Sequence, residues 1–173
     1  GMVDTAFYVP NAKLSRFGPV HDKNDKGEFY AIASVAKSPY RQPPLFESGG
    51  GGLVSTITDY ARFCQAMLNG GTLGGHRVLK ATTVRLMFTN QLPETLNLTF
   101  GLGFGIQSLE FGTGATKRTS TAYRWGGYAS TKFHVIPDEE LSVITLRQRV
   151  PGNSVTWTRL VPLLHRGIAP LDD

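Results

Sequence analysis

The feature that most constrains the fold is a change in hydrophobic spacing along the chain. Thr56-Ile57-Thr58-Asp59 has the form of a capping box, in which the threonine hydroxyl accepts a backbone hydrogen bond and the acidic side chain reaches back. Apolar residues then recur every three to four positions, until Asn69-Gly70-Gly71 ends the pattern: Tyr60, Phe63, Cys64, Met67 and Leu68. This spacing predicts an α-helix that starts near residue 56. A second, shorter helix is expected over residues 80–90.

After residue 100 the spacing becomes typical of strands. Residues 101–106, 131–136 and 141–147 alternate in polarity or are rich in β-branched side chains. Pro137-Asp138-Glu139-Glu140 separates the last two segments and has the composition of a tight turn, which predicts an antiparallel hairpin. An amphipathic helix is expected over residues 154–166, interrupted by proline.

These patterns predict an α+β fold in which the C-terminal helix packs on an antiparallel sheet and two further helices precede the sheet. We expect one domain over residues 1–173, because 173 residues with 40% hydrophobic content suffice for a sizeable core. Residues 1–48 are expected to be mostly irregular, since they are rich in proline and include a polar, turn-like stretch. Residues 49–90 should be helical, and residues 100–173 should form the sheet and the terminal helix.

Composition argues against several classes of function. Cys64 is the single cysteine, which excludes an internal disulfide, and its helical spacing predicts a buried apolar residue. The four histidines are scattered, so we expect no metal site. The glycine runs at 49–52 and 101–105 lack the residues that complete a phosphate loop, so we expect no cofactor.

Charge and hydropathy argue against nucleic acid and membranes as partners of this chain. The net charge of +5 is spread without a basic stripe, which argues against nucleic acid. No apolar run approaches the ~20 residues of a membrane helix, and the N-terminus has no signal-peptide pattern. We therefore expect a soluble chain, in the cytoplasm or the periplasm.

Ser34-Val35-Ala36-Lys37 has the Ser-x-x-Lys form of a nucleophile and its base. Such a pair acts when a helix places the lysine amine one turn from the serine. Pro39, Pro43 and Pro44 follow closely and prevent a long helix here. This context favours a decoy, that is, a chance match to the motif, over a true nucleophile at Ser34 and a true base at Lys37.

Trp125-Gly126-Gly127 is the second candidate site. Two glycines beside a tryptophan at the mouth of a strand leave a backbone edge to which a substrate can hydrogen-bond as an added strand. A β-bulge beside a core tryptophan fits the same residues.

Taken together, the residues resemble the C-terminal part of the serine β-lactamase and penicillin-binding-protein superfamily, nearest to class C β-lactamases and family VIII carboxylesterases. The resemblance covers nearly the whole chain in order and rests on these segments: Gly1 to Phe7, Pro43 to Thr56, Asp59 to Phe63, Leu68 to Gly71, Gly101 to Gly105, Trp125 to Gly127 and Phe133 to Asp138.

The resemblance implies roles for the residues around the second glycine pair. In that family a Trp-Gly-Gly triplet replaces the Lys-Thr-Gly-like motif in many esterase-like members, and Trp125, Gly126 and Gly127 match it. The backbone N–H of Tyr128 would then be an oxyanion-hole donor, and the triplet would border a small-molecule ester, β-lactam or peptidoglycan-like substrate.

The family's Ser-x-x-Lys and Tyr-x-Asn motifs precede the Gly-Met-x-Asp-Thr signature, which here begins at Gly1. The chain is therefore expected to correspond to the C-terminal portion of a serine hydrolase and to be inactive alone. The alternative is a non-catalytic remnant that acts as a binding or self-associating scaffold. By the same resemblance, the strand near residues 141–147 should lie at an unpaired sheet edge and promote self-association.

Overall fold

A computed structural model of the chain describes residues 1–150, 159–161 and 163–164. Contacts within the chain group it into two compact units. The described part of the first unit comprises residues 1–63, 126–132 and 144–150, and that of the second comprises residues 64–125, 133–143, 159–161 and 163–164. The expectation of a single domain over residues 1–173 is not tested by this grouping and stays a prediction.

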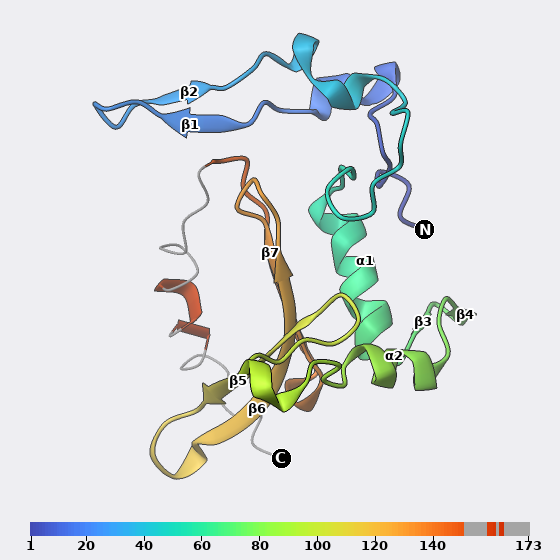
Figure 1. Cartoon of the computed structure of the whole chain (residues 1–173), viewed down its shortest axis with the longest axis vertical. Coiled ribbons are helices and arrows are strands. Elements are labelled where there is room, and N and C mark those ends of the chain that lie inside the picture. Colours follow the sequence, from blue (N-terminus) through green and yellow to red (C-terminus); the bar gives the residue numbers. More distant parts are fainter. Residues whose placement is uncertain (151–158, 162, 165–173) are drawn as a thin grey trace. The chain divides into compact units, whose positions relative to one another are not determined.

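The first unit begins with mostly irregular chain, as expected, but it contains a small antiparallel hairpin of β1 (His21–Lys23) and β2 (Phe29–Ala31) (Figure 1). The Asn24 side-chain oxygen accepts from the N–H groups of Lys26 and Glu28 at 3.0 and 2.9 Å. Gly27 adopts a φ of +81°, a left-handed conformation that glycine tolerates. The polar stretch is thus a hairpin turn. The rest of residues 1–48 contains three 3₁₀ turns: Asn11–Arg16, Val35–Lys37 and Pro39–Arg41.

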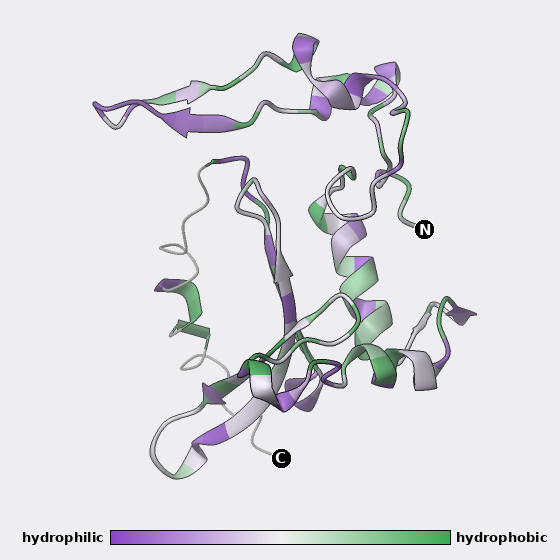
Figure 2. Cartoon of the chain, in the orientation of Figure 1, coloured by the Kyte–Doolittle hydropathy of each residue, from purple (hydrophilic) through white to green (hydrophobic). Residues whose placement is uncertain are grey.

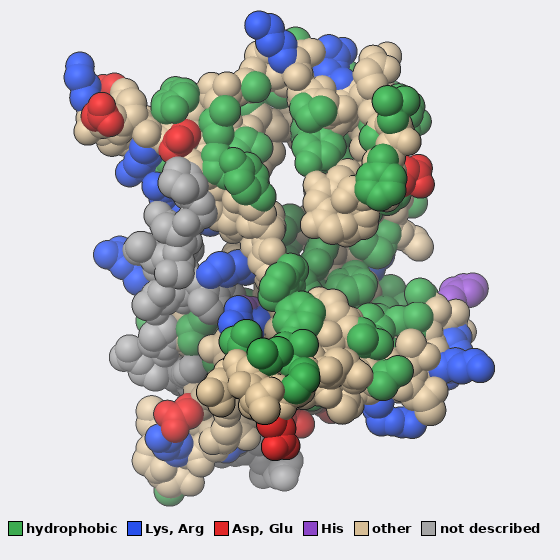
Figure 3. Space-filling model, in the orientation of Figure 1, with side chains coloured by type: hydrophobic (Ala, Val, Ile, Leu, Met, Phe, Trp, Pro, Cys, Tyr) green, Lys and Arg blue, Asp and Glu red, His purple; other side chains and the backbone are tan. Residues whose placement is uncertain are grey.

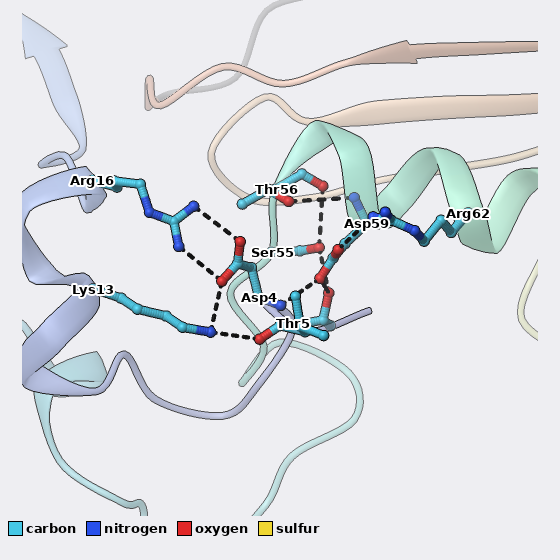
Figure 4. A network of polar contacts seen from close by, with 9 residues as sticks. Asp4, Thr5, Lys13, Arg16, Ser55, Thr56, Asp59 and Arg62 are labelled. Atoms are coloured by element: carbon cyan, nitrogen blue, oxygen red, sulfur yellow. Dashed lines mark hydrogen bonds and ion pairs between the residues drawn. The ribbon is translucent and has the colours of Figure 1, made fainter. Parts of the chain in front are cut away.

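Helix α1 (Ile57–Leu68) begins where the capping pattern predicted. The Thr56 hydroxyl accepts from the Asp59 N–H at 3.3 Å, which confirms half of the capping box. The other half is wrong, because the Asp59 carboxylate bonds instead to the distant Asp4 N–H at 2.7 Å and Thr5 hydroxyl at 3.0 Å (Figure 4), and to the nearby Arg62 guanidinium at 3.1 Å. Asp59 is buried, so these donors replace the water that its charge loses.

Asp4 extends this network to the Asn11–Arg16 turn. Its carboxylate accepts from Arg16 at 2.8 and 2.9 Å and from Lys13 at 2.7 Å. Arg16 and then Lys13 hold the pKa of Asp4 well below its usual range. The network therefore joins the first residues of the chain to the start of α1.

The second unit contains the end of α1, a short ladder and helix α2 (Ala81–Met87). Cys64 is fully buried, as expected, and burial raises the pKa of its thiol to about 12. The chain leaves α1 through Gly70 and Gly71, both at positive φ. A side chain at Gly71 would meet the Leu79 carbonyl oxygen at 2.3 Å, so this crossing requires glycine. The ladder pairs β3 (Thr72–Leu73) with β4 (His76–Arg77).

The main sheet has four strands in the order β5-β6-β7-β8, and β5 and β6 pair antiparallel (Figure 1). Their bounds are β5 (Gly105–Phe111), β6 (Arg118–Gly126), β7 (Lys132–Ile136) and β8 (Leu141–Thr145). The expected strand at 101–106 is displaced, because Gly103 turns the chain at a φ of +86° and β5 starts only at Gly105. Strand β6 was not among the expected segments. The hairpin turn after Ile136 is confirmed as a 3₁₀ turn, Pro137–Glu139.

Strand β8 is one of the two outer strands of this sheet among the described residues, and β5 is the other; the position of β8 agrees with the expected unpaired edge. All five of its residues are half-buried. Self-association through this edge stays a prediction.

One face of the sheet carries the core of the second unit. Leu109, Phe111, Ala122 and Ile136 are buried together, with Leu141 packed against them. Val161 and Leu164 line a small cavity with these residues, and residues 159–161 and 163–164 are helical. The helix on the sheet is thus present in the described residues. The remainder of the helix expected over residues 154–166 lies outside them.

A buried carboxylate fastens the β7–β8 turn to β6. Glu139, with 4% of its side chain exposed, accepts from Arg118 Nε at 2.9 Å and from a second nitrogen of the same guanidinium, and also from the Ser120 hydroxyl. The adjacent Asp138 accepts from the Thr121 N–H at 3.2 Å. Arg118 lowers the pKa of Glu139, and the Ser120 hydroxyl acts in the same direction against the effect of burial.

Glu139→Gln should lower the free energy of unfolding by about 1–3 kcal/mol, because it removes the charge from hydrogen bonds in a buried site. The folded-state pKa of Glu139 is depressed, so this stability is present above the ordinary carboxylate pKa and is lost as the pH falls through the folded-state value. Urea unfolding of both proteins at neutral and acidic pH measures the difference.

Glu110→Gln is the matched control, because Glu110 pairs with Lys117 while 65% of its side chain is exposed, and such pairs contribute little. Equal destabilisation by the two substitutions, or a Glu139 effect that grows in acid, would contradict this account.

Candidate active site at the end of strand β6

The chain turns sharply after β6, where the triplet lies. Strand β6 ends at Gly126, and the Gly127 N–H then donates to the Thr131 carbonyl at 2.9 Å. The Ser130 N–H donates to the Gly127 carbonyl at 3.1 Å. A side chain at Gly127 would place its Cβ 2.3 Å from the Thr131 hydroxyl oxygen. This close approach explains why the second position of the pair is glycine.

Ser130 anchors the turn to a segment that follows β8. Its side-chain hydroxyl donates to the Arg149 carbonyl at 2.7 Å, and the Arg149 N–H donates to the Ala129 carbonyl at 3.1 Å. Ser130 is buried and has a φ of +66°, which is uncommon for a residue with a side chain. Such a conformation persists when surrounding contacts determine it, so the turn has a defined shape.

Tyr128 lies at the exposed part of this turn. The residue is 85% exposed, and its backbone N–H has no hydrogen-bond partner among the described residues. The neighbouring N–H of Gly127 is used by the turn itself. The Tyr128 N–H is thus a backbone donor of this turn that is available to an external acceptor.

Trp125, the first residue of the triplet, lies in the second unit and is not a core residue. Its ring contacts the Phe100 ring edge-on, with centroids 4.8 Å apart, and 52% of the residue remains exposed. The ladder between β5 and β6 pairs residues one to one from Gly105 with Arg124 to Phe111 with Arg118, without a bulge. The half-exposed tryptophan does not fit a core residue, whereas this ladder ends before the triplet, so the open strand end stays a prediction.

Ser34 and Lys37 lie apart from any α-helix. Ser34 has extended backbone angles and precedes a single 3₁₀ turn, and both residues are exposed. The Lys37 N–H donates to the Ser34 carbonyl at 3.0 Å, which closes that turn. The two residues therefore lack the buried helical setting of a nucleophile and its base, and their assignment as a decoy stays a prediction.

No sequence pattern indicates the anchoring role of Ser130. The residue sits between an alanine and a threonine in a strand-like stretch, and its partner is 19 positions away. Phe100 was also missed, because the glycines that follow it were interpreted as part of a strand. Among the described residues, no three His, Cys, Asp or Glu side chains form a group that could hold a metal. No helix in the described part of the chain is long and apolar enough to cross a bilayer.

Gly127→Ala should lower the urea midpoint, because the new methyl group collides with the Thr131 hydroxyl. In a Thr131→Ala background the same change should cost clearly less. Gly49→Ala is the control, since no atom lies within 4 Å of its added methyl group. An equal loss in both backgrounds would show that the contact with Thr131 does not select glycine here.

Comparison with known proteins places the chain in a family. The family model described as Beta-lactamase matches residues 1–161. An uncharacterized protein of Mycobacterium tuberculosis is 32% identical over 170 residues, which cover 90% of this chain and 42% of that protein. A protein of Escherichia coli K12, described as a candidate D-alanyl-D-alanine carboxypeptidase, is 31% identical over 152 residues, which cover 84% of this chain and 30% of that protein.

Solved structures share the fold. Unliganded simvastatin synthase from Aspergillus terreus superposes with a TM-score of 0.75 at 21% identity, covering 94% of this chain and 45% of that one. The chain thus spans about two fifths or less of the length of the curated relatives named here. With a family match over residues 1–161, the chain belongs to the β-lactamase family.

Proposed function

We propose that this chain supplies the oxyanion-binding turn and part of the substrate border of a serine hydrolase that works through an acyl-serine intermediate. The N–H of Tyr128 donates to the carbonyl oxygen as negative charge develops on it. Trp125, Gly126 and Gly127 border the substrate, which is an ester or a β-lactam or D-alanyl amide.

The observation that carries this proposal is the free backbone donor at Tyr128 on an anchored turn. A donor stabilises a developing charge best when it is positioned before the reaction, so that no reorganisation is needed. The hydrogen bonds of Ser130 and Arg149 provide that positioning. Membership in the β-lactamase family and the described carboxypeptidase relative support the choice of acyl chemistry.

The proposal assigns no nucleophile within these residues. The one Ser-x-x-Lys sequence, Ser34 to Lys37, is exposed and lies on a single 3₁₀ turn, and no tyrosine has an asparagine two positions later. An acyl-enzyme requires a serine whose proton is taken by an adjacent base, and an oxyanion donor does not replace it. The chain by itself is therefore expected to be inactive.

A binding scaffold is the alternative function. The same free donor and the half-exposed Trp125 would bind a peptide or cell-wall fragment without cleaving it. This alternative predicts ligand binding that is unaffected by loss of any serine hydroxyl.

Intact-mass spectrometry after exposure to a fluorophosphonate, and in parallel to a penicillin, tests the assignment of the nucleophile. We expect no covalent adduct on this chain with either probe. The Ser34→Ala variant shows whether any adduct is attached to Ser34. Ser38→Ala is its matched control, since Ser38 lies in the same stretch and caps the next 3₁₀ turn. An adduct lost only in Ser34→Ala would overturn the decoy assignment and make Ser34 the nucleophile.

A further inference from the structure

Strand β2 is an exposed sheet edge with apolar side chains. All three of its residues, Phe29, Tyr30 and Ala31, are exposed, and Ile32 follows with 49% exposure. Phe29 and Tyr30 are 61% and 48% exposed, which is high for aromatic residues. Figure 2 shows hydrophilic residues along β1 and the hairpin turn, whereas Figure 3 shows hydrophobic side chains on the surface over β2.

The register shows which backbone groups of β2 face outward. The Asn24 N–H donates to the Glu28 carbonyl, and the Ile32 N–H donates to the Val20 carbonyl. Because hydrogen-bonded pairs alternate along an antiparallel ladder, Tyr30 is the next residue of β2 that faces β1. The N–H and carbonyl groups of Phe29 and Ala31 therefore point away from β1. The N–H groups of both residues have no hydrogen-bond partner among the described residues.

The opposite edge of this hairpin is already paired. The His21 N–H donates to the Gln148 carbonyl at 2.8 Å, and the Val150 N–H donates to the His21 carbonyl at 2.9 Å. Lys23 and Arg149 lie over the Phe29 ring, 4.8 and 5.7 Å from its centroid. Within the described part of the first unit, β2 is thus the open side of a ladder whose other side is paired at His21.

We propose that β2 pairs with β2 of a second copy of this chain, antiparallel and two-fold symmetric about Tyr30. In this register Phe29 of one copy faces Ala31 of the other, and both exchange hydrogen bonds through their outward N–H and carbonyl groups. The result is a continuous sheet in the order β1-β2-β2-β1. A two-fold axis satisfies the same groups on both copies, so the contact closes as a dimer.

The side chains fit this register. Tyr30 faces Tyr30 of the second copy in a non-hydrogen-bonded pair, where side chains come closest and aromatic pairs are favourable. The large Phe29 faces the small Ala31. Glu28 faces Ile32, so the single charge of this segment never faces its own copy. The self-complementary pattern is the reason to assign a second copy as the occupant.

Strand β8, the sheet edge for which self-association was expected from the sequence, fits less well. Its residues are all half-buried, whereas those of β2 are all exposed. Because the β2 contact is short, we expect a dimer that forms with rising protein concentration rather than a permanent one.

Size-exclusion chromatography with light scattering over a range of protein concentrations tests the proposal with the full chain. The apparent mass should double for the unaltered protein. Tyr30→Lys and Tyr30→Glu should each stay monomeric, because like charges then face each other at the two-fold axis. An equal mixture of the two variants should recover the dimer. Ser142→Lys, which places the same charge on β8, should leave the dimer intact.

A strictly monomeric unaltered chain overturns the proposal, as does a dimer lost in Ser142→Lys but retained in Tyr30→Lys. Failure of the mixture to dimerise overturns the register about Tyr30. If circular dichroism shows that the Tyr30 variants are unfolded, amide exchange in the unaltered chain decides instead. The amides of Phe29 and Ala31 should then exchange more slowly as concentration rises, and concentration-independent exchange would refute the contact.

Discussion

Strand β6 is the element on which the candidate site depends, because the sheet pairs it on both sides up to the point where the site begins. Seven consecutive pairs with β5, from Gly105–Arg124 to Phe111–Arg118, fix its register. The Glu139 carboxylate holds the start of β6 through Arg118 and Ser120. At the other end, the chain leaves the ladder at Gly127 and its backbone polar groups need new partners. Hydrogen bonds of Ser130 and Arg149 satisfy part of the turn, whereas the Tyr128 N–H has no partner among the described residues.

Buried carboxylates have a consistent role in both units. Asp59 in the first unit and Glu139 in the second are each almost fully buried, and each receives several donors from residues distant in sequence. A buried charge without such donors would cost several kcal/mol, so the folded arrangement strongly favours these specific partners. Each carboxylate therefore selects one way of joining segments that are distant in the sequence: Asp59 joins the first residues of the chain to α1, and Glu139 joins the β7–β8 turn to β6.

Much of the fold could be predicted from local chemistry. The start of α1 at Thr56, its end at Gly70 and Gly71 and the turn at Pro137 each follow from residues that act within a few positions of themselves. The strand at 101–106 was misplaced because alternating glycines resemble a strand pattern, whereas Gly103 at positive φ makes a turn. Strand β6 was missed as an element although its end, the Trp-Gly-Gly triplet, was identified as a site. The triplet could be found because glycine and tryptophan are distinctive, whereas its anchor is an ordinary serine.

The sequence alone determined the boundaries of α1, the burial of Cys64, the α+β class and the family resemblance, because each depends on local spacing or on motifs in a fixed order, whereas α2 ends at Met87, earlier than expected. Only the tertiary structure decided what Asp59 binds, since its partner Asp4 lies 55 positions away and the same residue would also fit a local cap. The same holds for the shape of the turn at Tyr128, which depends on a hydrogen bond to Arg149, and for the open edge of β2, which depends on which strands find partners. Such pairings depend on which distant segments compete for the same backbone groups. The local spacing of residues does not predict the outcome of that competition.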